Sequence, residues 1–290
     1  MKYRLYVLLA ALLFSTGGAA IKATTLTSWQ VACLRSLIAA TVLLVLLPEA
    51  RQLRSGRVWL ASGAYASTLV LYVLANKLTT AANAIFLQAT APFYLLAIGP
   101  LLLKEPNARR DYLLGGVMAV GMALFFLDSS GASALAPNPA LGNALAAATG
   151  LTWALTVTAL RGLSKEEGAS SLPVVSAGNL VAFAVSLPFA WPMADVGAAD
   201  WTRLLYLGVF QIGLAYYCMT RGVKHVPAFE ASVLILLEPA MNPVWTYLVH
   251  GEKPGALSLA GGVVIMAATV GHTLTAPKEA RPETPAPHRD

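Results

Sequence analysis

The chain has 290 residues, of which 57% are hydrophobic and 12% are charged, whereas a typical soluble domain carries about 25% charged residues. This composition excludes an ordinary soluble protein and indicates an integral membrane protein. The formal net charge of +6 does not indicate a nucleic-acid partner, because Lys and Arg stand in short clusters between apolar runs rather than in a basic stripe.

Pro, Gly, Asn and clusters of charged residues divide the chain into ten apolar segments. Each segment is close to the roughly 20 residues that a helix needs to cross a bilayer. The first segment, with Lys2, Arg4 and small residues behind an apolar run, imitates a cleavable signal peptide. We expect it to be retained, because it belongs to the repeat described below. In chain order, the predicted helices are 4–22, 28–47, 58–76, 80–103, 110–128, 140–161, 171–190, 201–221, 228–249 and 255–275.

The distribution of Lys and Arg predicts the orientation of these helices, because short cytoplasmic loops carry an excess of both residues. If the N-terminus is cytoplasmic, fifteen Lys and Arg residues fall on the cytoplasmic side of the membrane. Four fall on the other side: Lys22, Lys77, Arg203 and Lys253. We therefore predict a multi-pass protein with its N- and C-termini in the cytoplasm.

The two halves of the chain resemble each other. A shift of 147 residues lays residues 77–105 on residues 224–252, so that Pro92 falls on Pro239 and a Glu closes both segments. Pro, Glu and Gly-Gly recur in one order, which favours duplication over a chance likeness of apolar stretches. We predict a first five-helix repeat at 1–128, a linker at 129–139, a second repeat at 140–275 and a disordered cytoplasmic tail at 276–290.

A repeat with five helices has a structural consequence. Because five is odd, the second copy enters the membrane from the opposite side, which gives an inverted-topology repeat. Secondary transporters use this architecture, with a substrate site near the midplane between the repeats. The predicted fold class is therefore an all-α integral membrane protein with ten transmembrane helices in two inverted five-helix repeats.

Prolines and a carboxylate stand where a membrane helix should be most regular. Glu238 lies about 15 Å into the ninth predicted helix, near the middle of a hydrocarbon layer roughly 30 Å thick. Pro239 and Pro243 follow it, and Pro92 lies near the middle of the fourth helix. Such breaks persist only where protein or a water-filled cavity surrounds them. We predict that the three prolines break or hinge their helices.

A charge at the depth of Glu238 costs about 2.5 to 3.5 kcal/mol on insertion scales, so Glu238 should face the bundle interior. Two interpretations stay open for it: a cap for backbone groups that the prolines free, or a direct role in substrate or proton binding. Arg35, about 9 Å into the second helix, is interpreted as a structural charge that reaches the membrane surface or a helix end.

Aromatic and amide side chains inside the predicted spans are candidates for the wall of a substrate cavity. Each is individually more typical of packing than of a site, but together they suit an apolar solute with a polar part. The candidate substrate-binding residues are Tyr72, Asn83, Gln88, Tyr94, Trp153, Tyr217 and Glu238.

Catalytic and metal chemistry has little support in the sequence. The two cysteines, Cys33 and Cys218, lie inside apolar segments and cannot form a disulfide framework or a metal cluster. No HExxH, CxxC, phosphate-binding glycine loop or GxSxG motif occurs. We expect no catalytic residue, no metal and no cofactor, and therefore no enzyme.

These features together resemble a known family. Ten spans in two halves, a proline in the fourth helix, Glu238-Pro239 in the ninth, and Glu105 and Glu252 just before the fifth and tenth helices are similar to the EamA-type permeases of the drug/metabolite transporter superfamily. Arg35, in CLRSL, fits the same pattern. The first half departs from it by carrying Ala91 where the second half has Glu238.

The resemblance implies a carrier in the bacterial inner membrane that moves metabolites by alternating access. The chain is similar in particular to YddG-type exporters of aromatic and other neutral amino acids. We predict a secondary transporter that exports such amino acids around a central midplane cavity, with the lipid bilayer as its other partner, as a monomer or a homodimer. One alternative is a multidrug exporter of hydrophobic cations with Glu238 as counter-charge. An alternative of another class is an intramembrane enzyme or a membrane assembly subunit.

Overall fold

Helices make up nearly all of the described structure, because a backbone inside a bilayer must satisfy its hydrogen bonds within its own segment. The computed structural model describes residues 1–103, 107, 109–128, 133–164, 170–193, 196–223, 225 and 234–275. Within these ranges no strand forms, and the β contact present is an isolated bridge between Ser133 and Ala136 in the predicted linker. The all-α prediction is confirmed, and the predicted tail at 276–290 lies outside the described residues.

The first half of the chain follows its five predicted helices. The first consists of α1 (Lys2–Ser15) and α2 (Gly17–Ala23), the second is α3 (Ser28–Leu46), and the third is α4 (Gly56–Leu78), with the short 3₁₀ turn η1 (Pro48–Arg51) between α3 and α4. The fourth is divided into α5 (Ala81–Gln88), α6 (Ala91–Ile98) and the π-helical turn η2 (Gly99–Leu103), and the fifth is α7 (Arg109–Leu127).

The second half does the same. Its helices are α8 (Pro139–Ser164), α9 (Leu172–Ala190), a continuous rod of α10 (Ala198–Leu205), π-helical η3 (Tyr206–Leu214) and α11 (Ala215–Val223), then α13 (Leu237–His250) and α14 (Ala256–Thr275). The predicted start of the ninth helix, at 228–233, lies outside the described residues.

Six of the described helical stretches are long and apolar enough to cross a membrane. They are Lys2–Ala23, Ser28–Leu46, Gly56–Leu78, Ala81–Leu102, Pro139–Ala159 and Leu172–Ala190. Two shorter apolar helices, Asp111–Leu127 and Ala256–Gly271, accompany them. The lengths and composition support a multi-pass membrane protein.

Three of the predicted helices are interrupted rather than straight. The fourth helix breaks at Ala89 and Thr90, just before Pro92, and the ninth has a turn at Leu236 before Pro239. Proline cannot donate a backbone hydrogen bond, and its ring clashes with the carbonyl four residues earlier, so the break falls upstream of the ring. The third interruption, at Thr16, was not predicted.

Pro243 behaves differently from the other two prolines. It lies inside α13, which continues through it to His250, so the helix does not break at this position and a hinge there stays a prediction. The hydroxyl of Thr246 donates to the carbonyl oxygens of Asn242, at 3.2 Å, and Pro243, at 3.1 Å. Both bonds lie in the turn after the proline ring, whereas the acceptor that loses its helical N–H donor is the carbonyl of Pro239, four residues before Pro243.

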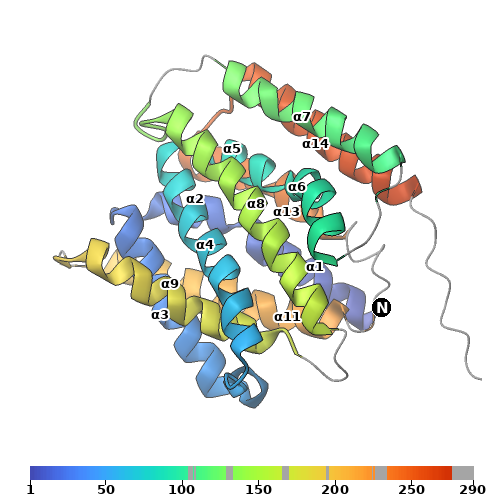
Figure 1. Cartoon of the computed structure of the whole chain (residues 1–290). Coiled ribbons are helices and arrows are strands. Elements are labelled where there is room, and N and C mark those ends of the chain that lie inside the picture. The colour runs from blue at the N-terminus through green and yellow to red at the C-terminus, as the bar shows by residue number, and fades with distance from the viewer. Residues whose placement is uncertain are drawn as a thin grey trace, which may run out of the picture.

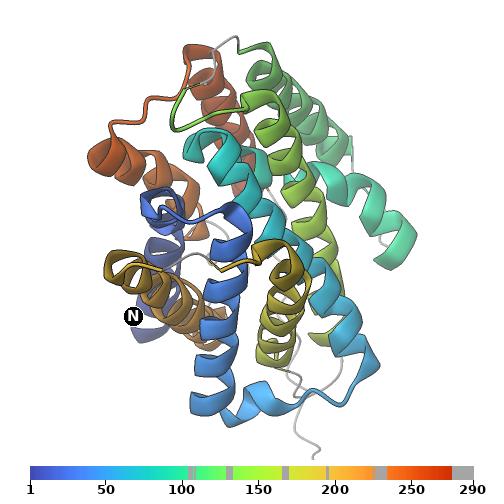
Figure 2. The ribbon, with the colours of Figure 1, turned by 90° about the vertical axis from the view of Figure 1, so that its left-hand side faces the viewer.

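Two helix pairs flank the remaining helices of the bundle. Figures 1 and 2 both show α7 and α14 side by side along one edge, and α3 lies against α9 on the opposite side. Between them, α4 packs on α8, and α1 packs on α11. When the two halves of the chain are exchanged, the contact of α4 with α8 corresponds to the contact of α11 with α1. In the same way, the contact of α4 with α9 corresponds to the contact of η3 with α3.

Glycine allows the closest approach of these helices. A Cβ atom added to Gly18 would lie 2.8 Å from Asn242 Oδ1 and 2.8 Å from Ala81 Cβ, and one added to Gly17 would lie 2.8 Å from Gln211 Nε2. Membrane helices associate through such small residues, because lipid supplies no hydrophobic drive between them. The Gly17-Gly18 pair that imitates a signal-peptide site therefore brings α2 against α5, α13 and η3.

Candidate functional site

A fully buried arginine lies within the bundle. Arg35, on α3, is 1% exposed, and its Nη2 donates to the backbone carbonyl of Leu69 on α4 at 3.1 Å. Its Nε has no hydrogen-bond partner in the described part of the structure. A guanidinium carries five N–H donors, so this bond leaves the charge far from satisfied.

Three tyrosines lie near the guanidinium. Arg35 interacts electrostatically with Tyr65 and Tyr72 of α4 and with Tyr216 of α11. The rings of Tyr65 and Tyr216 meet edge to face, with centroids 5.4 Å apart. Tyr65 is 1% and Tyr72 is 8% exposed, so both phenols lie deep in the protein.

A carboxylate borders the same tyrosines. Glu238, in the first turn of α13, interacts electrostatically with Tyr72 and Tyr216. It precedes the last residue of α13, His250, by twelve residues, or about 18 Å along the helix. Glu238 is nevertheless partly exposed.

The two charges do not neutralise each other. Arg35 and Glu238 form no ion pair and no hydrogen bond with one another, although both interact with Tyr72 and Tyr216. We call the set Arg35, Tyr65, Tyr72, Tyr216 and Glu238 the central cluster. It combines a cation, an anion and phenols that can donate or accept hydrogen bonds.

An asparagine closes the cluster on one side. Asn242, one turn beyond Glu238 on α13, is fully buried, and its Nδ2 donates to the Tyr72 hydroxyl at 3.3 Å. On α9, Asn179 lies beside Tyr65 and donates to the carbonyl of Val175 at 2.8 Å.

The structure therefore brings Tyr72 and Glu238 together with Arg35, and it places the other candidates elsewhere. Asn83 lies near the start of α5, where its Nδ2 donates to Asn143 Oδ1 at 3.0 Å and to Thr79 Oγ1 at 3.3 Å. This network joins α5 to α8. Gln88 ends α5, at the interruption of the fourth helix, and its Oε1 has no hydrogen-bond partner among the described residues.

The aromatic candidates are divided among three places. Tyr94 and Trp153 pack together with Ala91 and Ala154 where α6 meets α8. Trp153 also reaches the apolar cluster that contains Tyr216. Tyr217 lies under the exposed Arg221, whose guanidinium carbon is 5.4 Å from the ring centroid. The neighbour of Tyr217 in sequence, rather than Tyr217 itself, belongs to the central cluster.

Sequence reasoning missed two members of this region. Tyr65 and Asn242 lie in apolar segments, and nothing in the local sequence of Tyr65 separates a phenol that packs from one that meets a charge. Helical spacing offers one signal. Asn242 lies four residues after Glu238, and therefore on the same face of α13.

A second buried ionic group lies near one end of the bundle. Lys22, at the end of α2, pairs with Glu252 at 3.2 Å, and their side chains are 2% and 4% exposed. The Lys22 ammonium also donates to the carbonyl oxygens of Thr79, at 2.8 Å, and Leu135. Both Glu252 oxygens accept from the backbone N–H of Ala81, each at 3.2 Å. We call this set the Lys22 network.

The local sequence explains how Glu252 reaches this position. Gly251 ends α13 with a φ of 65°, a left-handed conformation that costs glycine little. The turn directs Glu252 to the first residue of α5, where a helix N-terminus favours a negative charge. Glu105, which the repeat aligns with Glu252, lies outside the described residues.

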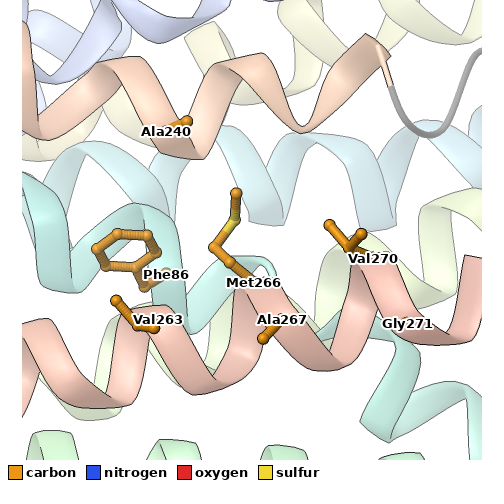
Figure 3. A pocket seen from close by; sticks show the side chains of 8 residues that line it. Phe86, Ala240, Val263, Met266, Ala267, Val270 and Gly271 are labelled. Atoms are coloured by element: carbon orange, nitrogen blue, oxygen red, sulfur yellow. The ribbon is translucent and has the colours of Figure 1, made fainter.

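An apolar pocket lies apart from both charged groups. It has a volume of about 580 Å³, and Figure 3 shows Met266 and Val270 of α14 pointing toward α13, with Phe86 of α5 at one side. Its other lining residues are Ala240, Gly262, Val263, Ala267 and Gly271. Because it lacks a charged or hydrogen-bonding side chain, this pocket suits an alkyl chain and offers nothing to a polar solute.

Among the described residues, no group of three or more His, Cys, Asp or Glu residues could hold a metal ion. The central cluster offers binding chemistry, because it combines side chains of opposite charge with phenol hydroxyls. None of its groups forms the arrangement of nucleophile and base that hydrolysis requires.

Comparisons with known proteins add an independent observation. The model of the EamA-like transporter family matches residues 1–127 and 140–274. The pseudopaline exporter CntI of Pseudomonas aeruginosa (strain UCBPP-PA14) is 28% identical over 281 residues, which cover 93% of this chain and 95% of that protein. The threonine/homoserine exporter RhtA of Escherichia coli (strain K12) is 25% identical over 186 residues, which cover 63% of this chain and 62% of that protein.

The fold also has a solved relative. A protein of known crystal structure superimposes with a TM-score of 0.64 at 20% sequence identity, covering 95% of this chain and 99% of the other. At this identity the likeness concerns the fold alone.

Proposed function

The chain belongs to the EamA-like transporter family, and from this premise we propose that it exports neutral amino acids, aromatic ones among them, across the bacterial inner membrane. Membership in the family makes it a multi-pass membrane transporter of small molecules and not an enzyme. The central cluster is the observation that carries the choice of substrate. A buried cation and a partly exposed anion that are not paired suit a solute that bears both charges.

The similar proteins support export, and one of them supports an amino acid substrate. One is a threonine/homoserine exporter and the other a pseudopaline exporter. The aromatic preference rests on the chain itself. Phe14 of α1 lies edge to face against Tyr216, with ring centroids 4.9 Å apart, so an aromatic wall adjoins the charged groups.

Alternating access between two inverted repeats is the proposed mechanism. Two observations support the repeats: the family model matches two segments with nearly the predicted repeat boundaries, and the helix contacts are largely preserved when the halves are exchanged. The interruptions before Pro92 and Pro239 lie inside the two helices that the repeat pairs. We propose that they act as pivots around the central cluster.

The proposed orientation has both termini in the cytoplasm, which places the Lys22 network near the extracytoplasmic surface. In this conformation the network ties α2, α4, α5 and the segment after α13 together. Substrate would enter from the opposite end of the bundle. Release would require the ties of the Lys22 network to open.

Counterflow tests the proposed function. Purified protein is reconstituted into liposomes preloaded with unlabelled amino acid, and uptake of labelled L-phenylalanine, L-leucine and L-threonine is measured against protein-free liposomes. Saturable uptake of at least one of them is expected. No uptake of any of the three, together with transport of a lipophilic cation such as ethidium, would replace the proposal with the multidrug alternative. Arg35 argues against that outcome, because it repels a cation from the cluster.

A further inference from the structure

We propose that Arg35 and Glu238 hold the two ends of an α-amino acid zwitterion, with Arg35 binding the α-carboxylate and Glu238 binding the α-ammonium. This inference rests on the proposed function and assigns Arg35 a binding role in place of the structural role that its sequence position indicated. It follows from the burial and hydrogen bonding of Arg35, from the absence of a described cation beside Glu238 and from the neighbours that the two residues share.

The first step concerns Arg35. A buried charge is retained at low cost only when it is paired and hydrogen-bonded. Arg35 is 1% exposed, donates to one backbone carbonyl at 3.1 Å and leaves Nε without a partner. A guanidinium presents parallel N–H groups that match a carboxylate in a bidentate pair. The group that would complete Arg35 is therefore a carboxylate.

The second step concerns Glu238. The side chain lies deep along α13, is partly exposed and forms no ion pair with a described Lys, Arg or His. A partly exposed carboxylate that has no described cation beside it is complementary to an ammonium group. Because Arg35 and Glu238 do not pair with each other, both can bind a ligand.

The third step concerns the spacing between them. Arg35 donates to the carbonyl of Leu69 on α4 at 3.1 Å, and three residues later on α4 the Tyr72 hydroxyl accepts from Asn242 at 3.3 Å, one turn beyond Glu238 on α13. Arg35 and the part of α13 that carries Glu238 therefore contact the same turn of α4. In an α-amino acid the carboxylate and the ammonium are separated by a single carbon, so the molecule can face both residues at once. The phenol hydroxyls can donate to its carboxylate.

The arrangement also explains selectivity. A hydrophobic cation satisfies Glu238 and is repelled by Arg35, and a simple carboxylate satisfies Arg35 and is repelled by Glu238. A zwitterion satisfies both and adds no net charge to the membrane interior. Specificity of this kind rests on penalties to the wrong ligand as well as on contacts to the right one.

Competition by analogues of one substrate tests the clamp in the wild-type protein. The probe is counterflow of labelled L-phenylalanine, with L-phenylalaninamide, which lacks the carboxylate, and 3-phenylpropanoate, which lacks the ammonium, as competitors. Each should compete at least roughly tenfold more weakly than unlabelled L-phenylalanine, as expected for the loss of a charged hydrogen bond. If phenylalanine counterflow is saturable and the amide competes equally well, the clamp is wrong while the proposed function stands.

Variants assign each end of the clamp. In Arg35→Gln, half-saturation by L-phenylalanine should rise by roughly tenfold or more, and the amide should no longer be the weaker competitor. In Glu238→Gln, the same should hold for 3-phenylpropanoate. Arg221→Gln and Glu49→Gln, which alter an exposed pair at 3.7 Å, are the matched controls and should leave both ratios unchanged.

Two outcomes separate the remaining possibilities. If Arg35→Gln weakens phenylalanine and its amide by the same factor, Arg35 acts only on the structure and its assignment is overturned. If Arg35→Gln does not purify as a monodisperse protein, the competition series in the wild type decides, and Arg35→Lys supplies the second variant, since it keeps the charge and loses the bidentate geometry. Absence of any amino acid counterflow would reject the proposed function instead.

Discussion

The Lys22 network and the central cluster both contain a cation and an anion, but the two charges are paired in the first and unpaired in the second. Lys22 and Glu252 are 3.2 Å apart, and backbone groups of Thr79 and Ala81 complete their hydrogen bonds. Arg35 and Glu238 share neighbouring phenols and form no pair. A buried charge that is fully paired holds helices together, whereas a charge without a partner inside the protein can bind another molecule.

The two groups also differ in how they change the free energy of the observed conformation. The Lys22 network stabilises the observed conformation because its hydrogen bonds exist in this conformation. The central cluster carries the desolvation cost of two charges without the pairing that would offset it, so a ligand can supply the missing partners. The following predictions test this difference through stability, from the largest expected change to the smallest.

The largest change is expected from Glu252→Gln. It removes the carboxylate that pairs with Lys22, leaving an ammonium that is 2% exposed without its counter-charge. Breaking a buried pair in this way costs about 3 to 5 kcal/mol. Thermal unfolding in detergent, followed by the loss of the monodisperse peak in size-exclusion chromatography, should show a clearly lower midpoint than for the wild type. An unchanged midpoint would mean that the pair contributes nothing to this conformation.

The sequence shows in advance that Glu252 matters, but not why. The repeat brings out Glu252 and the preceding glycine, and the ten-helix pattern follows from apolar runs of suitable length. Lys22 as its partner could not be predicted, since the two are 230 residues apart and meet through the packing of four helices. In the same way, Pro92 and Pro239 predict the interruptions that precede them, whereas α13 continues through Pro243.

The central cluster shows the same limit more strongly. Tyr72, Glu238 and Arg35 could be selected because each is a polar residue in an apolar run. Tyr94, Trp153 and Tyr217 meet the same criterion and lie elsewhere in the structure. What separates the two groups is which helix face meets the interior, and in a membrane protein both faces of a helix are apolar, so periodicity carries little information.

Gly18→Ala should produce an intermediate change. The added methyl group would lie 2.8 Å from Asn242 Oδ1 and from Ala81 Cβ, so α2 would have to move away from α13 and α5. Overpacking of this kind costs about 1 to 3 kcal/mol. The matched control is Gly63→Ala, also in a helix, where a Cβ atom meets nothing within 4 Å. The same thermal assay should show a lower midpoint for the first variant and no loss for the second.

A smaller change is expected from Arg221→Gln. Arg221 lies 3.7 Å from Glu49, and the two side chains are 50% and 45% exposed. Exposed ion pairs contribute about 0 to 1 kcal/mol, because water and salt screen them. The melting midpoint should change little, and less still in a buffer with 0.5 M NaCl. A loss as large as that for Glu252→Gln would mean that exposure does not distinguish these two pairs.

The smallest stability change, and the sharpest contrast with Glu252→Gln, is expected from Glu238→Gln. The substitution is chemically identical, yet it removes a charge that no described cation neutralises. Since the carboxamide has almost the same shape and costs less to bury than the charged group, the melting midpoint should stay at the wild-type value or rise. Counterflow of labelled L-phenylalanine should fall in the same preparation. A protein that melts at a lower temperature after this change would show that Glu238 is paired in the folded state, as Glu252 is, and would remove the ammonium-binding end from the central cluster.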